Sequence, residues 1–143
     1  MLIWDGLKVH SPRIEPNENV LVTIRSIFPP PGTIIAIEMV SCYGMPVGKE
    51  VFETCLFIGQ LIEICHTRGF LRKLIYRRDI KLHHCGTARA KDANIRQALI
   101  DKYGEPSTNK NQGRTYGLKS HLWSAFAVAA YVSETTKEQA WAH

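Results

Sequence analysis

The sequence feature that most constrains the fold is the segment from residue 33 to residue 40, which is rich in isoleucine and almost continuously apolar. A run of this kind is typical of a central strand that is covered on both faces. One carboxylate, Glu38, interrupts it. A buried carboxylate is costly unless it is paired or bound to a metal. Either this end of the strand reaches solvent or the strand delivers Glu38 to a metal cluster, and physical reasoning alone favours neither explanation.

The rest of the chain predicts an α/β fold with strands concentrated early and helices late. An Asp5-Gly6 turn between two β-prone runs predicts a hairpin, and a helix is expected between residues 15 and 28, before a proline-rich stop. Residues 49–68 predict a long amphipathic helix that Gly69 caps, and residues 71–76 predict a strand. The remaining elements are expected to be an extended piece at 80–83, a helix at 91–103, a loop at 105–116 and an alanine-rich helix at 118–132 that packs against a sheet.

Length and composition indicate one globular domain. A chain of 143 residues with 45% hydrophobic and 22% charged residues is long enough to bury a core. No apolar run reaches the roughly 18 residues that span a bilayer, and the N-terminus lacks the features of a signal peptide. We therefore expect a cytoplasmic protein. The cysteines show no C-x-x-C pairing and predict reduced thiols; a zinc site is a less favoured alternative, to be built from Cys65, His66, His83, His84 and Cys85.

Positive charge is concentrated in the middle of the chain. The net charge is −1 for residues 1–40, +5 for residues 41–103 and +1 for residues 104–143. A localised basic surface favours a polyanionic partner, because each neutralised phosphate releases counterions. Charge alone fits an ordinary solvated face better. The basic residues of the segment from 72 to 91 are Arg72, Lys73, Arg77, Arg78, Lys81, Arg89 and Lys91.

Two further features could carry chemistry. His121 and Ser124 lie three residues apart near the start of the last predicted helix, so they share a face. A surface histidine is the default interpretation of His121, and a metal or general-base role would need Glu38 as a partner. The loop at residues 43–48 follows the Glu38 strand directly, where loops of α/β sheets commonly line binding crevices. It lacks the pattern of a nucleotide phosphate loop.

Three segments together resemble the RuvC-like resolvases of the ribonuclease-H-like superfamily, especially the versions in phage genomes. They are the Glu38 strand with its loop and helix, the basic element from Lys81 to Asp92, and residues 121–129. The resemblance implies that Glu38 is the second catalytic carboxylate. It further implies that Lys81 and Lys91, with Arg89 nearby, contact DNA phosphates, and Arg77, Arg78 and Tyr43 are candidates for the same DNA surface.

The same resemblance implies a function, a cofactor and a partner. The family members are endonucleases of Holliday junctions and other branched DNA, with two Mg²⁺ or Mn²⁺ ions and a homodimer that presents two sites. His121 and Ser124 occupy positions that are usually acidic. Histidine can still ligate a metal and would favour Mn²⁺ over Mg²⁺, whereas serine is a poor ligand.

The larger departure is at the front of the chain. The family opens with a strand that carries a metal-bridging aspartate, and this sequence begins in what resembles the second strand, so we expect the first strand to be missing. Asp5, at the hairpin tip, is not expected to replace that aspartate. The alternative function is therefore a catalytically inactive nucleic-acid-binding domain of the same fold. An actin-like or sugar-kinase-like module ranks last, because the chain is short and lacks phosphate-binding glycine turns.

Overall fold

The computed structural model describes residues 1–106 and 108–141, with side chains up to residue 137. The chain divides into two compact units. We call Glu15–Arg77 the sheet unit, and Met1–Ile14 together with Arg78–His143 the helical unit. The assignment of the whole chain to one domain stays a prediction.

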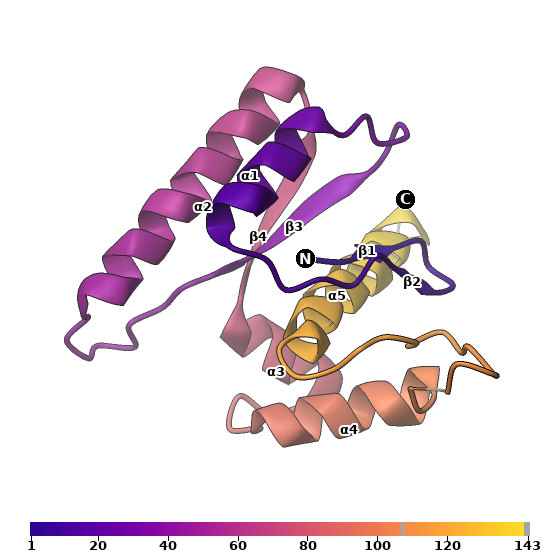
Figure 1. The fold of residues 1–143 in the computed structure, drawn as a ribbon. Coiled ribbons are helices and arrows are strands. Elements are labelled where there is room, and N and C mark those ends of the chain that lie inside the picture. Colours follow the sequence, from indigo (N-terminus) through magenta and orange to yellow (C-terminus); the bar gives the residue numbers. More distant parts are fainter. Residues whose placement is uncertain (107, 142–143) are drawn as a thin grey trace. The chain divides into compact units, whose positions relative to one another are not determined.

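The sheet unit is built around two parallel strands, β3 (Ile34–Met39) and β4 (Leu71–Tyr76). They pair without offset, from Ile34 opposite Leu71 to Met39 opposite Tyr76, so that Glu38 lies opposite Ile75. The helix α2 (Lys49–Arg68) connects the strands and packs on both of them, and α1 (Asn17–Ser26) packs against α2 (Figure 1). These four elements agree closely with the sequence prediction.

The end of α2 shows why the prediction was accurate there. Gly69 adopts a left-handed conformation with φ of 67°. Its N–H donates to the carbonyl of His66 at 3.2 Å, and the N–H of Phe70 donates to the carbonyl of Cys65 at 2.8 Å. These bonds satisfy carbonyl groups that the helix leaves without a partner. Residue Gly69 thus ends the helix and turns the chain into β4.

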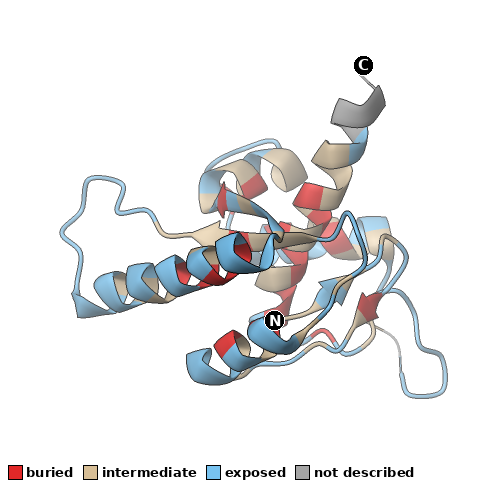
Figure 2. Cartoon of the chain, turned by 90° about the horizontal axis from the view of Figure 1, so that it is seen from above, coloured by how far each residue is buried: buried red, intermediate tan, exposed pale blue. Residues whose placement is uncertain are grey.

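The prediction that the Glu38 strand is covered on both faces is wrong. Only Ile37 of the six residues of β3 is buried, and the other five residues of this strand are partly exposed. Figure 2 shows by colour how far each described residue of the chain is buried. Within the described residues β3 pairs with β4 alone, so its other edge has no strand beside it. An apolar run can indicate a strand, but it cannot indicate how many neighbours the strand has.

The helical unit contains a hairpin and three helices. The strands β1 (Ile3–Trp4) and β2 (Val9–His10) are antiparallel. The helices are α3 (Arg77–Cys85), whose first residue belongs to the sheet unit, α4 (Asp92–Tyr103) and α5 (Leu122–Trp141). Helix α5 packs against β1 and α4, and its buried Phe126 meets the rings of Trp4 and Tyr103 edge to face at 5.1 and 5.2 Å.

The predicted hairpin is confirmed, and Asp5 organises its turn. One carboxylate oxygen of Asp5 accepts hydrogen bonds from the backbone N–H groups of Leu7 and Lys8, each at 2.8 Å. The other oxygen lies 2.6 Å from Nε2 of His10. The carboxylate is therefore engaged in local structure, as an aspartate at a turn commonly is.

Two predictions about the helical unit are corrected. The expected extended piece at residues 80–83 is helical, because Ile80, His83 and His84 recur at a spacing of three and four residues and turn toward the interior together. The last helix begins at Leu122 rather than at 118, since Ser120 just before it has a φ of 47° that no α-helix contains. No helix among the described residues is long and apolar enough to cross a membrane.

Candidate active site

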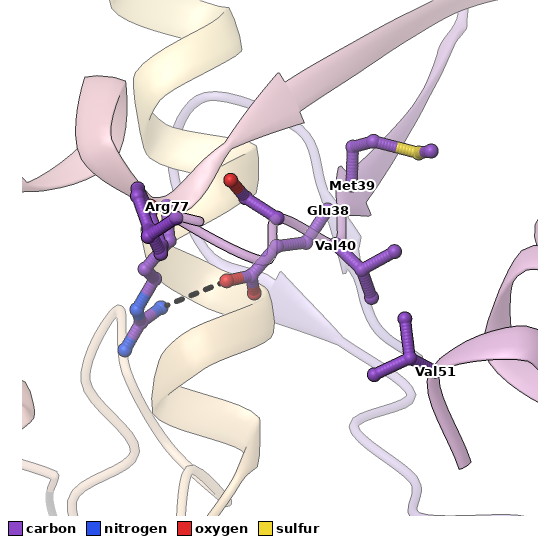
Figure 3. Close-up of a pocket in the computed structure, with 7 residues that line it drawn as sticks. Glu38, Met39, Val40, Val51 and Arg77 are labelled. Carbon is purple, nitrogen blue, oxygen red and sulfur yellow. Dashed lines mark ion pairs between the residues drawn. The ribbon is translucent and has the colours of Figure 1, made fainter. Parts of the chain in front are cut away.

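Glu38 lies near the carboxyl end of β3, at the edge of an open pocket. Its side chain is 35% exposed. The pocket has a volume of about 370 Å³ and is formed by the end of β3, the following loop, the first turns of α2 and the residue after β4 (Figure 3). Ligands of open α/β sheets bind at this carboxyl end of the strands. The residues that line the pocket are Glu38, Met39, Val40, Ser41, Tyr43, Val51 and Arg77.

Arg77 forms an ion pair with Glu38 across the pocket. Its Nη1 lies 3.5 Å from Oε1 of Glu38, and its side chain is only 19% exposed. Because β3 and β4 are parallel and pair without offset, the residues at their carboxyl ends are neighbours. Both conditions that make a carboxylate tolerable in an apolar strand are therefore met: Glu38 is at a strand end open to solvent, and it is paired.

Arg77 was predicted from the sequence to bind DNA, and its contact with Glu38 was not predicted. Both residues are at the carboxyl ends of predicted strands, which is the sequence feature that could have predicted this ion pair. The prediction would also have needed the order and register of the strands, which hydrophobic periodicity does not supply.

The loop that follows β3 supplies the open side of the pocket. Residues 41–50 are all exposed. Tyr43 is 61% exposed and has a φ of 48°, in the left-handed region that costs a non-glycine residue about 1 kcal/mol. Gly44 follows with a φ of 79°. An exposed aromatic ring on such a loop could contact a ligand that enters the pocket.

His121 and Ser124 lie at the start of α5. His121 is exposed, and its carbonyl accepts hydrogen bonds from the N–H groups of Ser124 and Ala125 at 3.1 and 3.3 Å. Ser124 is half-buried in the first turn of the helix. Both residues belong to the helical unit and Glu38 to the sheet unit, so the convergence of these three side chains stays a prediction.

Four of the predicted DNA-binding residues are in the helical unit. Arg78 and Lys81 are three residues apart on α3, with Arg78 exposed and Lys81 half-buried. Arg89 and Lys91 are exposed in the connection to α4, where the N–H of Lys91 donates to Oδ1 of Asn94 at 2.8 Å. Their contact with DNA stays a prediction.

The arrangement of strands and helices has a counterpart among solved structures. The chain is similar to the RuvC structure from Thermus thermophilus, with a TM-score of 0.58 over 94% of this chain and 87% of that chain. The chain has a RuvC-like fold. The sequence identity is 16%, so this likeness concerns the fold alone. No family model and no curated protein matches the sequence.

The α/β, ribonuclease-H-like fold class predicted from the sequence is thus confirmed. Within the described residues the strands form two pairs, β1 with β2 and β3 with β4.

The residues of the Glu38 pocket fit a divalent ion in part. Glu38 offers the hard oxygen ligands that Mg²⁺ and Mn²⁺ prefer, at an edge open to solvent. Within the described part of the sheet unit, no two further His, Cys, Asp or Glu side chains join it in a metal-binding group. The group of three that the described residues do bring together is His83, His84 and Glu134, in the helical unit. Glu134 was not predicted as a ligand from the sequence, because it shares no local motif with the two histidines.

Proposed function

We propose that this chain is a metal-dependent endodeoxyribonuclease domain that acts on Holliday junctions or other branched DNA. The observation that carries the proposal is the position of Glu38, a carboxylate at the carboxyl end of a strand and at the edge of an open pocket, in a RuvC-like fold. Recombination, repair or phage DNA processing, in the cytoplasm of a bacterial or phage-infected cell, would be its setting.

Glu38 would hold a divalent ion, Mg²⁺ or Mn²⁺, on the pocket side of β3. A bound ion supplies charge neutralisation and an activated water for phosphodiester hydrolysis. Arg77 has two tasks in this proposal. Its guanidinium holds the Glu38 carboxylate in place, 3.5 Å away, and it also offers a positive charge to a DNA phosphate. His121 would complete the ligand set or transfer a proton, and Ser124 would hold a water molecule.

The basic side chains of α3 and the α3–α4 connection would bind the DNA backbone. Arg78, Arg89 and Lys91 are exposed, as phosphate contacts require, and Lys81 is partly so. Phosphate contacts position DNA without reading its sequence, so selectivity for branches would come from shape. Tyr43 would contact the DNA at the mouth of the pocket. A homodimer would present two such sites to one junction.

The central experiment compares cleavage of a four-way DNA junction with cleavage of a linear duplex of the same sequence. Wild-type protein, Glu38→Gln and the control Glu63→Gln, which changes an exposed carboxylate of α2, are assayed in Mn²⁺ and in Mg²⁺. We expect junction-selective cleavage that Glu38→Gln abolishes and Glu63→Gln retains. Cleavage that survives in Glu38→Gln removes this residue from the reaction.

The choice of ion tests His121 separately. An imidazole is a more natural ligand for Mn²⁺ than for Mg²⁺, so we expect faster cleavage in Mn²⁺. Equal or faster cleavage in Mg²⁺ would argue against direct ligation by His121.

One observation favours a second candidate function. The resemblance to the RuvC-like resolvases implies a metal-binding carboxylate at position 124, where this chain has a serine, which is a poor metal ligand. The second candidate is therefore a non-enzymatic domain that binds branched nucleic acid. If this function is correct, the protein binds a junction with a salt-dependent affinity, cleaves it in neither ion, and keeps the same binding affinity in Glu38→Gln.

A further inference from the structure

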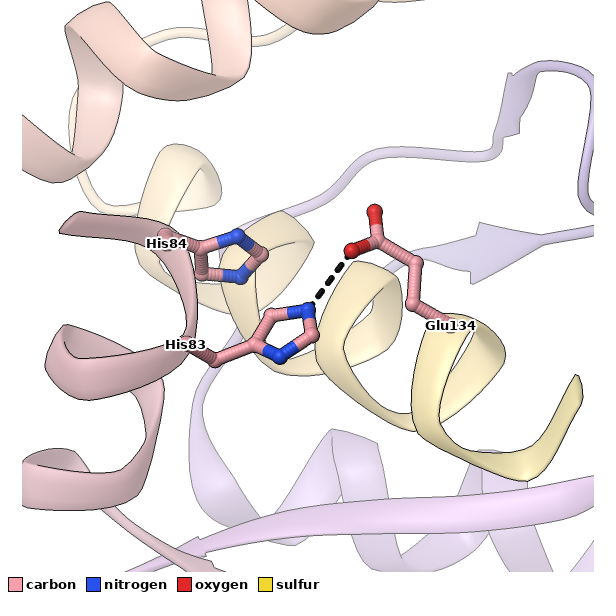
Figure 4. A group of neighbouring side chains, drawn as sticks. All are labelled: His83, His84 and Glu134. Carbon is pink, nitrogen blue, oxygen red and sulfur yellow. Dashed lines mark hydrogen bonds and ion pairs between the residues drawn. The ribbon is translucent and has the colours of Figure 1, made fainter. Parts of the chain in front are cut away.

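Three metal-ligating side chains meet within the helical unit. His83 and His84 come from the last turn of α3, and Glu134 comes from α5 (Figure 4). The ligand atoms that they offer all lie within 4.8 Å of one another, and all three residues are half-buried. Nε2 of His83 is 2.6 Å from Oε2 of Glu134, and the two imidazole rings meet edge to face at 4.9 Å.

The hydrogen bond of His84 leaves one of its ring nitrogens available as a ligand. Its Nε2 donates to the backbone carbonyl of Ala127 at 2.9 Å. In the neutral imidazole, Nδ1 then carries the lone pair. A histidine that ligates a metal almost always donates its other N–H to a carbonyl or carboxylate in this way, since the bond fixes the ring. Burial also lowers the pKa of His84, which the bond to Ala127 offsets only in part.

Glu134 is held in the form and orientation that a metal ligand needs. The hydroxyl of Tyr103 donates to Oε1, and Nζ of Lys102 lies 2.8 Å from Oε2. Burial alone would raise the pKa of Glu134, but the hydrogen bonds from Lys102, Tyr103 and His83 outweigh it and lower the pKa to about 2. The carboxylate is therefore ionised, and Tyr103 binds Oε1, the carboxylate oxygen that does not face His83.

We infer that His83, His84 and Glu134 form a binding site for one transition-metal ion, with Zn²⁺ as the best fit, that joins α3 to α5. Two imidazoles and one carboxylate are a donor set that Zn²⁺ uses, whereas Mg²⁺ prefers oxygen ligands alone. Two ligand atoms that are each about 2.1 Å from one tetrahedral ion are about 3.4 Å apart. The widest separation here, up to 4.8 Å, must therefore shorten, and the 2.6 Å between His83 and Glu134 must lengthen, when the ion binds.

Lys102 is the cation that Zn²⁺ would replace beside Glu134. Oε2 of Glu134 now faces the Lys102 ammonium and the N–H of His83. When the ion binds, His83 changes tautomer: the proton on Nε2 passes to solvent, Nδ1 takes up a proton from solvent, and the lone pair of Nε2 in the neutral ring bonds to the metal. The Lys102 side chain is 55% exposed, so its ammonium can move into water. Lys102 is therefore a competitor of the metal, which makes the inference testable by a gain of affinity.

The test is Zn²⁺ binding to the full chain under reducing conditions without DNA, measured by competition with a chromogenic chelator. We expect one Zn²⁺ per chain and a loss of affinity of at least about tenfold in Glu134→Gln and in His84→Ala. The matched control Glu105→Gln changes an exposed carboxylate of the same unit and should bind as wild type does. Circular dichroism of each metal-free variant establishes that it is folded.

Lys102→Met gives a readout that misfolding cannot imitate. Removal of the ammonium should tighten Zn²⁺ binding by roughly two- to fivefold, which is the range for an exposed ion pair. Lys119→Met, which changes an exposed lysine elsewhere in the unit, should leave it unchanged. Unchanged or weaker binding in Lys102→Met would overturn the assignment.

Co²⁺ as a spectroscopic probe separates this site from thiolate sites and from the pocket of Glu38. We expect the visible bands of four- or five-coordinate Co²⁺ without a thiolate charge-transfer band. A strong thiolate band would assign the ion to cysteine and overturn the inference. Glu38→Gln should bind Zn²⁺ and Co²⁺ as wild type does; loss of binding in that variant would place the ion at the other site. Failure of DNA cleavage leaves these outcomes unaffected.

Discussion

Nη1 of Arg77 lies 3.5 Å from Oε1 of Glu38. The two residues are neighbours because Glu38 is near the carboxyl end of β3, Arg77 directly follows β4, and these parallel strands pair without offset. The register that sets Met39 opposite Tyr76 brings together the residues at both strand ends. A slip of one residue would move the Glu38 side chain to the other face of the sheet. The pairing of β3 with β4 is therefore what gives the candidate active site its acidic and basic partners.

Arg77→Met tests whether this guanidinium also binds DNA. We expect weaker binding of a four-way junction, and a slope of log affinity against log salt that is smaller by about one, because one phosphate contact is lost. Fluorescence anisotropy at several salt concentrations measures both quantities. Arg25→Met, on the exposed side of α1, should change neither. An unaltered slope in Arg77→Met would confine Arg77 to its ion pair with Glu38.

Two glycines of the same helix make a matched test of the fold. Gly69 ends α2 with a φ of 67°, where a side chain is strained. Gly69→Ala should lower the free energy of unfolding by about 1 kcal/mol. Gly59 is inside α2, and a Cβ there would meet nothing within 4 Å. Gly59→Ala should raise the free energy of unfolding by about 0.5–1 kcal/mol, because alanine loses less entropy in a helix.

Denaturation by urea, monitored by circular dichroism, measures both changes. If the two substitutions change the free energy of unfolding in opposite directions, backbone conformation and not residue size governs the effect. Changes in the same direction would contradict the left-handed conformation of Gly69 at the end of α2.

Local patterns explain how much of the fold the sequence could predict. The turn at Asp5-Gly6 and the Gly69 cap are decided by neighbouring residues, and both were predicted correctly. The helix at α3 was missed, since an isoleucine, a leucine and two histidines in a short segment fit either a strand or a helix. The short segment has no glycine or proline to decide between them.

The candidate site was less predictable, because its parts are distant in the sequence. Glu38 stood out as a charge in an apolar strand, but its partner Arg77 depends on strand register. Glu134 contacts His83 although the two residues are 51 positions apart in the sequence, and no local spacing predicts that contact. The proposed partnership of Glu38 with His121 is a question of the same kind and stays a prediction.

The cysteines should differ sharply in reactivity. All four are free thiols; Cys42 and Cys55 are exposed, and Cys65 is buried with 0% of its surface accessible. Burial raises the pKa of the Cys65 thiol, and the positive charge of Arg72 offsets this only in part. We expect rapid alkylation of Cys42 and Cys55 by a maleimide and much slower alkylation of Cys65, measured by mass spectrometry of peptides. Urea should abolish the difference; rapid modification of Cys65 without it would contradict its burial.

The turn of the β1–β2 hairpin should resist acid. Backbone hydrogen bonds from Lys8 and Leu7 and the side chain of His10 hold the pKa of Asp5 far below its usual value. A carboxylate with a lowered pKa stabilises the folded hairpin at every pH above its unfolded value of about 3.9. That contribution is lost only as the pH falls through the lower, folded value. We therefore expect Asp5 to remain ionised at pH 3, with its turn intact, when its side-chain carbon is followed by NMR.

Asp5→Asn separates this carboxylate from the other acidic groups. The amide oxygen can still accept a backbone hydrogen bond, but it carries no charge for His10. We expect the NMR signals of Leu7 and Lys8 in this variant to lose the pH dependence that they show below pH 3 in the wild type. Titration of Asp5 at its ordinary value in the wild type would mean that the bonds at 2.8 Å to Leu7 and Lys8 do not persist in solution.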